Sequence, residues 1–141
     1  MKGRIARVQE RIKRTAEACG RSVTDIRLVA VSKTMPVEIV REAIETGMTD
    51  FGENYIQEEK ISTLATYPVT WHYIGHLQSN KAKYAVRMFD LIHSVDSLKL
   101  AKALDKYAQK IGKVQNILVQ VNVAKEDSKS GVYGDDAIRL V

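Results

Sequence analysis

Hydrophobic residues follow two alternating patterns along the chain after residue 26. Short apolar runs, which are typical of buried strands, alternate with stretches in which apolar residues recur every three or four positions, which is typical of helices that face a core. The five runs start 20 to 26 residues apart. They predict strands over residues 27–31, 49–52, 69–74, 90–93 and 116–123.

The stretches between the runs predict helices with recognisable ends. Pro36 suits the first turn of one helix, and Gly47 suits the position that ends it. Ser97 can cap another helix with its side-chain oxygen, and Gly112 can end that helix. Two further helices are predicted over residues 54–65 and 79–88.

The repeated order of strand and helix predicts right-handed βαβ units, a parallel sheet and a single domain over residues 1–141. Two architectures use such units. A five-stranded doubly wound parallel sheet suits a chain of 141 residues. A (β/α)8 TIM barrel requires at least about 200 residues. Length favours the doubly wound sheet, but the periodicity does not show whether helices cover one face or both, so both architectures stay open.

The N-terminal segment carries the basic excess of the chain. Residues 1–22 hold seven basic and two acidic side chains, which accounts for the whole formal net charge of +5. The apolar spacing over residues 3–19 predicts an amphipathic helix. Two glutamates and the absence of serine before Ser22 argue against a transit peptide. Without aromatic residues for base stacking, nucleic-acid binding is weakly supported. We expect a solvated surface helix, with no nucleic-acid and no membrane partner.

The overall composition is that of a soluble globular protein, with 45% hydrophobic and 28% charged residues. No apolar run approaches the roughly 18 residues of a membrane-spanning helix. Cys19 is the only cysteine, so the chain cannot form an internal disulfide. These features predict a cytoplasmic protein.

Polar residues follow each predicted strand, where ligands bind in both architectures. Lys33 comes just after the apolar run 28–31 and just before a helix, so we expect its amine at the mouth of the sheet or barrel. Partial desolvation there would favour the neutral, nucleophilic form of the amine. A solvated loop lysine is the alternative, since lysine is mostly exposed.

Other chemistries have weaker support. His72, His76 and His93 raise the question of a metal site, but His72 and His76 straddle a strand end and no carboxylate or cysteine has matching spacing. We therefore predict no metal, with His72 packed inside and His76 on the rim. The chain has no glycine-rich phosphate loop and no nucleophile-elbow motif, which argues against nucleotide binding and against a Ser-His-Asp hydrolase.

Several strings carry a resemblance to a known family. They are LVAVSKTMPVE, DFGENYIQE, WHYIGHLQSNK, IHSVDS and VQVNVAKEDSKSG. In this order, over residues 3–134, they resemble the pyridoxal 5′-phosphate (PLP) homeostasis protein family, which looks like the barrel domain of alanine racemase standing alone. The resemblance implies a (β/α)8 barrel of the alanine racemase N-terminal type, of which this chain holds about the first five βα units.

The resemblance also implies a cofactor site and a function. Lys33, in the matching VSKT element, would be the Schiff-base lysine for PLP. Asn54 in the FGEN element, and His76 and Ser79 in the GHLQSN element, would line the pocket. The implied function is PLP (vitamin B6) and amino-acid homeostasis without established catalysis. Amino acids or apo-PLP enzymes would be partners, and the full-length form would be a monomer.

The chain departs from the family at its end. Family members continue for about three more strand–helix units, where a Ser/Met/Gly-rich turn and an Arg-Ile-Gly element hold the cofactor phosphate. Neither occurs in these 141 residues, so we expect only the aldehyde-facing half of the site. A PLP-dependent racemase is an alternative, but it needs acid/base groups on both faces of the cofactor. A protein that binds nucleic acid or membrane through its basic helix is the third possibility.

Overall fold

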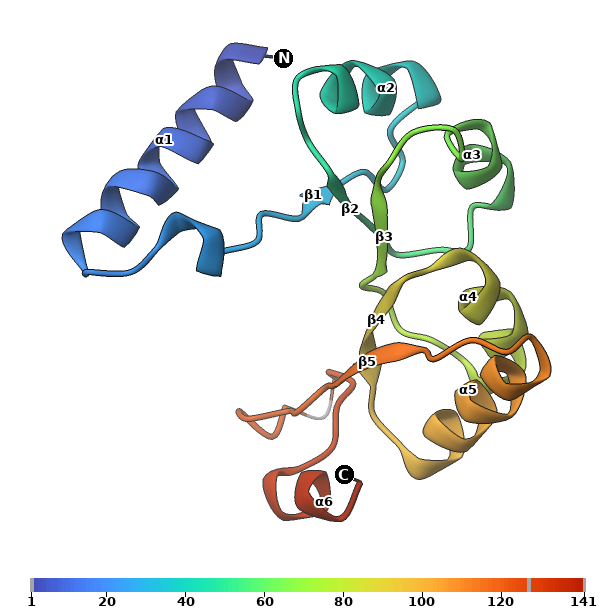
Figure 1. Cartoon of the computed structure of the whole chain (residues 1–141). Helices are drawn as coiled ribbons and strands as arrows, with labels where there is room; N and C mark the ends of the chain where they lie inside the picture. Colours follow the sequence, from blue (N-terminus) through green and yellow to red (C-terminus); the bar gives the residue numbers. More distant parts are fainter. Residues whose placement is uncertain (1, 127, 141) are drawn as a thin grey trace.

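The structure is a computed structural model that describes residues 2–126 and 128–140. Within these residues, parallel strands form a single five-stranded sheet, with helices between them (Figure 1). The strands are β1 (Ala30–Val31), β2 (Asp50–Glu53), β3 (Thr70–Tyr73), β4 (Leu91–Val95) and β5 (Asn116–Val119). The helices are α1 (Lys2–Ala18), α2 (Val37–Glu45), α3 (Glu58–Thr63), α4 (Ala82–Met88), α5 (Leu98–Lys110) and α6 (Gly134–Leu140), with short 3-10 helices η1 (Val23–Asp25) and η2 (Ser79–Lys81).

The strand order distinguishes the two predicted architectures. The strands lie in the order β1-β2-β3-β4-β5, and each neighbouring pair is parallel. A doubly wound sheet reverses its strand order at a switch point, whereas a barrel adds each strand next to the previous one. Figure 1 shows α2, α3, α4 and α5 along one face of the sheet. The doubly wound alternative is therefore wrong, and the partial barrel is confirmed.

The hydrophobic core lies between the sheet and these four helices. Phe51 of β2 packs against Trp71 of β3 with 5.7 Å between ring centroids, and Tyr73 meets Phe89 edge-on at 5.0 Å. Phe89 and Leu104, from the helical layer, are almost fully buried. Burying side chains of this size contributes about 1.5–3 kcal/mol each to stability. This core fixes the strands whose carboxyl ends carry the predicted site.

The opposite face of the sheet is the one that a complete barrel would enclose. Ile117 is paired with Ile92, which lies in the helix-side core, so the adjacent Leu118 points to the opposite face. By the same alternation Val31, paired with Gly52, points there as well. Leu118 is 48% exposed and Val31 53% exposed. The described residues therefore leave part of the inner face open.

The helix ends agree with the sequence in most places. The Ser97 side chain accepts a hydrogen bond from the backbone N–H of Leu100, as expected of a cap. Gly112 has the positive φ of +64° that suits a helix end. Pro36, predicted in the first turn of α2, instead occupies the position just before it. The predicted helix over 79–88 begins as the 3-10 helix η2 and continues as α4. The helix predicted over 54–65 is half as long in the structure, where α3 spans Glu58–Thr63.

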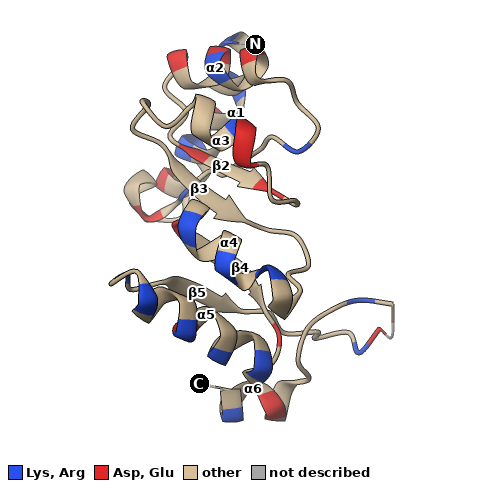
Figure 2. Ribbon diagram, turned by 90° about the vertical axis from the view of Figure 1, so that its right-hand side faces the viewer, with Lys and Arg blue, Asp and Glu red and all other residues tan. Residues whose placement is uncertain are grey.

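Exposed basic side chains line two helices, α1 and α5. Ala16 is the buried residue of α1, and the basic side chains of α1 are exposed, which agrees with a solvated helix. Figure 2 shows a second basic stripe, along α5. Among the described residues, no helix is both long and apolar enough to cross a membrane. The α5 stripe consists of the exposed residues Lys99, Lys102, Lys106 and Lys110.

Candidate functional site

The segments that follow β1, β2 and β3 lie side by side at the carboxyl edge of the sheet. The backbone N–H of Ser32 donates to the Gly52 carbonyl at 2.9 Å, which extends the pairing of β1 with β2 by one residue. A Cβ atom at Gly75 would overlap the backbone of Asn54, so only glycine lets these two segments approach so closely. The predicted site residues Asn54 and His76 are thereby carried on neighbouring segments.

Lys33 lies in a tight turn directly after β1. The backbone N–H of Met35 donates to the Ser32 carbonyl at 3.0 Å and closes the turn. Thr34 has a φ of +63°, as the third residue of a type II turn requires, although a β-branched residue is strained there. The Lys33 side chain is exposed and makes no hydrogen bond or ion pair with any described residue. The described residues thus do not supply the desolvation that its position predicted.

A buried polar cluster lies beneath this turn. Lys60, on α3, donates from Nζ to Glu53 Oε1 at 2.9 Å and to the Ser32 carbonyl at 3.0 Å. The Ser32 hydroxyl donates to the same Glu53 oxygen at 2.8 Å. All three residues are buried: Lys60 is 7% exposed, Glu53 0% and Ser32 4%. Sequence reasoning missed Lys60, because a lysine on a short polar helix is normally solvated.

His76 connects the segments that follow β3, β4 and β5. Its Nδ1 lies 3.1 Å from Ser130 Oγ and 3.7 Å from Asp96 Oδ2. Both groups meet the same ring nitrogen, whereas a Ser-His-Asp triad uses the two nitrogens separately. The hydroxyl of Tyr73 donates to the His76 carbonyl at 3.1 Å. His76 is thus a positioned rim residue with a 59% exposed side chain.

A hollow of about 390 Å³ opens between the ends of β3 and β5. His76 and Ser130 line it, together with the buried Asn122. The Asn122 side-chain amide donates to the Glu126 and Lys129 carbonyls and so holds the loop after β5 in place. Of the predicted site residues, His76 is part of this lining. The half-buried Asn54 and Ser79 and the exposed Lys33 lie outside it.

A second polar chain crosses the inner face of the sheet. Asp50 Oδ1 lies 3.0 Å from His72 Nε2, and His72 Nδ1 lies 2.9 Å from His93 Nε2. Burial, and secondarily the neighbouring His72, lower the pKa of His93 from its ordinary value of 6.5. His72 is buried, as predicted. Among the described residues, no group of three or more acidic, histidine or cysteine side chains is placed to hold a metal ion.

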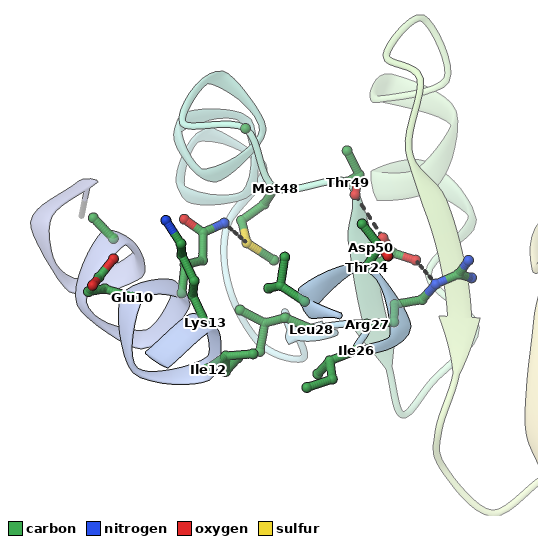
Figure 3. A pocket seen from close by; sticks show the side chains of 14 residues that line it. Glu10, Ile12, Lys13, Thr24, Ile26, Arg27, Leu28, Met48, Thr49 and Asp50 are labelled. Carbon is green, nitrogen blue, oxygen red and sulfur yellow. Dashed lines mark hydrogen bonds and ion pairs between the residues drawn. The ribbon is translucent and has the colours of Figure 1, made fainter. Parts of the chain in front are cut away.

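A separate hollow of about 580 Å³ lies at the amino ends of the strands, between α1 and the starts of β1 and β2. Figure 3 shows the Asp50 carboxylate in it, with Arg27 Nε at 3.5 Å and the Thr49 hydroxyl at 2.7 Å. Lys33 follows the other end of β1, so this hollow is distinct from the rim that carries the predicted site.

The sequence matches a known family over nearly its whole length. Residues 4–141 match the family described as alanine racemase, N-terminal domain. The chain belongs to this family. The sequential parallel sheet with helices on one face agrees with that assignment, and the resemblance inferred from the motifs is confirmed.

Curated relatives of this chain carry names that refer to PLP. The chain is 46% identical over 134 residues to the pyridoxal phosphate homeostasis protein of Pseudomonas aeruginosa, covering 94% of this chain and 58% of the relative. It is 42% identical over 133 residues to the Escherichia coli K12 protein of the same name, covering 91% and 57%. The chain therefore spans less than two thirds of the length of these curated relatives.

Solved structures of relatives show the same fold. PipY of Synechococcus elongatus PCC7942, solved with PLP bound, is 38% identical, with a TM-score of 0.75 over 91% of this chain and 60% of PipY. The alanine racemase of Clostridium difficile 630 is 13% identical, with a TM-score of 0.66 over 82% of this chain and 31% of the racemase. This second likeness concerns the fold alone.

Proposed function

We propose that the chain binds PLP and holds it as a Schiff base on Lys33, for PLP and amino-acid homeostasis and not for turnover. The observation that carries the proposal is the placement of Lys33. Its amine is exposed in a turn at the carboxyl edge of a barrel-type sheet, unpaired with any described residue, while Ser32 beside it is buried and fixed. The names of the relatives and the PLP-bound PipY structure support the choice of cofactor.

The described residues fit the aldehyde end of this cofactor. When bound, PLP supplies an aldehyde that a primary amine can attack and a ring that withdraws electrons. Lys33 offers that amine. Asn54 and Ser79 offer uncharged polar side chains on the adjoining segments, and His76 offers an imidazole whose Nδ1 side is held by Ser130. In this proposal these three residues bind and orient the ligand beside Lys33.

We propose a carrier and not a racemase, because Lys33 alone can serve only one of the two cofactor faces at which racemisation needs an acid/base group. A racemase requires a proton donor and a proton acceptor on opposite faces of the cofactor. Lys33 could serve one face, and the relatives are named for homeostasis. We therefore propose that amino acids or apo-PLP enzymes receive the cofactor. The free, exposed Cys19 agrees with the cytoplasmic location that forms part of this proposal.

Absorbance spectroscopy tests the proposal directly. The chain mixed with PLP is expected to develop a Schiff-base absorption band that borohydride removes, and peptide mass spectrometry is expected to place the reduced adduct on Lys33. Lys33→Ala should lack the band. Lys102→Ala, which removes an exposed lysine of α5, should keep it. Absence of the band in the unmodified chain would contradict PLP binding, and conversion of L-alanine to D-alanine above the Lys33→Ala background would favour the racemase.

A further inference from the structure

We infer that the buried Lys60–Glu53 pair is a positioning device: it orders the turn over residues 32–35 and so fixes where Lys33 presents its amine. The consequence for cofactor capture rests on the proposed function, whereas the ordering of the turn does not. Neither residue touches the hollow at the rim, and both act through Ser32.

Ser32 is the point through which the pair acts. Its carbonyl accepts two hydrogen bonds at 3.0 Å, from the Met35 N–H that closes the turn and from Lys60 Nζ on α3. Its hydroxyl donates to Glu53, and its own N–H donates to the Gly52 carbonyl. All the polar groups of the residue next to Lys33 are therefore engaged, two of them by the buried pair.

The energetics favour a geometric role for this pair over a purely stabilising one. A buried ion pair is often no more stabilising than apolar residues of the same volume, because each ion loses its hydration. Here Glu53 Oε2 is buried without a hydrogen-bond partner among the described residues, which adds a further cost. Thr34 adds backbone strain in the same turn. An arrangement this costly is explained if directional hydrogen bonds to Ser32 are what the site requires.

The chemistry of Lys33 explains why the position of the turn matters. In condensation with an aldehyde, the lone pair of Nζ attacks the carbonyl carbon, and the carbonyl oxygen leaves as water with both amine protons. A bound aldehyde meets the nitrogen productively only from a narrow range of positions. A displacement of about 1 Å can slow such a reaction by up to about a hundredfold.

The decisive variant replaces both charges with neutral side chains of similar size, Lys60→Met together with Glu53→Gln. It leaves no unpaired buried ion, so the protein should fold, but the Ser32 carbonyl loses its tether to α3. Lys113→Met is the control, because Lys113 is a half-buried lysine whose amine also donates to backbone carbonyls, those of Val86 and Phe89, away from the turn.

Two measurements separate positioning from general stability. At saturating PLP, we expect the rate of adduct formation on Lys33 to fall roughly tenfold or more in the double variant. Without cofactor, we expect hydrogen exchange at the Met35 amide to accelerate about tenfold, as for the loss of a charge-assisted hydrogen bond. The Lys113→Met variant should leave both values near those of the unmodified chain.

The outcomes distinguish the inference from the proposed function. Unchanged adduct rate and Met35 exchange in the double variant would overturn the inference, as would an equal loss of rate in Lys113→Met. If the unmodified chain forms no adduct, the proposed function fails. The exchange of the Met35 amide in the double variant then decides alone whether the pair orders the turn.

Discussion

Gly75 lets two segments of the rim touch because it has no side chain. Gly75→Ala places a Cβ atom against the backbone of Asn54, which cannot move aside as a flexible side chain would. We expect a loss of about 1–3 kcal/mol in the free energy of unfolding, measured by urea denaturation. Gly3→Ala is the control, since its Cβ meets nothing within 4 Å and its position in the first turn of α1 should change the stability by no more than about 0.5 kcal/mol. Equal effects of the two substitutions would contradict the close approach.

His93 makes stability depend on pH. Because burial lowers its pKa below 6.5, the unfolded chain takes up a proton at a higher pH than the folded protein does. The free energy of unfolding should therefore be full above about pH 6.5 and decline as the pH falls below it, by at most about 1.4 kcal/mol per pH unit for one proton. Denaturation curves from about pH 8 to about pH 5 test this.

The matched variant for that measurement is His93→Gln, which keeps a polar side chain but cannot take up a proton in this range. The decline below about pH 6.5 should become shallower in this variant. A slope identical to that of the unmodified chain would assign the pH dependence to other groups.

The place of Lys33 in the fold was predictable from the sequence, but the surroundings of its side chain were not. Lys33 directly follows a strand in the sequence, and the structure places it at that edge of the sheet. Its exposure depends on which distant segments cover it, and local pattern does not reveal that. The contact between Lys60 and Ser32 joins residues 28 positions apart, so no local spacing announces it. The same holds for the contact of His72 in β3 with Asp50 in the neighbouring strand β2, which joins residues 22 positions apart.

Among the elements, α5 has the clearest signals at both ends. The Ser97 oxygen accepts the Leu100 N–H at 3.3 Å, and this N–H would otherwise lack a partner at the helix start. Ser97→Ala is expected to lower the free energy of unfolding by about 1 kcal/mol. Ser97→Asp keeps an acceptor and should be close to the unmodified chain when both variants are measured by thermal denaturation. A loss as large in Ser97→Asp as in Ser97→Ala would argue against the cap.

The long N-terminal helix was easier to predict than the short helix α3 or the lengths of the outer strands. The apolar spacing placed the N-terminal helix at 3–19, and α1 spans Lys2–Ala18. The outer strands are shorter than their apolar runs. The run over 27–31 yields β1 at Ala30–Val31, and the run over 116–123 yields β5 at Asn116–Val119. Strand length depends on pairing with a neighbour, and in the described sheet each outer strand has a neighbour on one side.

At the scale of the whole molecule, length alone favoured the wrong architecture. A five-stranded doubly wound sheet and the first five units of a barrel contain the same strands and helices in the same order along the chain. They differ in which strands are neighbours and in whether helices cover one face, and both properties arise from contacts between distant residues. The family motifs resolved the ambiguity because they identify a relative whose topology is already set.

The open inner face predicts self-association of the 141-residue chain. Leu118 and Val31 expose apolar surface there, and strands with an unpaired side tend to pair with other chains. We expect the apparent mass in light scattering to rise with protein concentration, and Leu118→Lys to weaken that rise. A monomer at all concentrations would contradict the prediction. An unchanged rise in Leu118→Lys would contradict it too. Val114→Lys, at an 88% exposed position, is the control and should leave the rise unchanged.

The sequential strand order has a consequence for how the protein is made. Because each strand pairs with the one synthesised just before it, the sheet can grow while the ribosome is still translating. Parallel pairing of strands about 20 residues apart is slower than forming local helical contacts, but each pairing step needs only the unit that was synthesised just before. The turn that carries Lys33 follows β1, so its buried cluster can form once α3 has emerged, before β4 and β5 are translated.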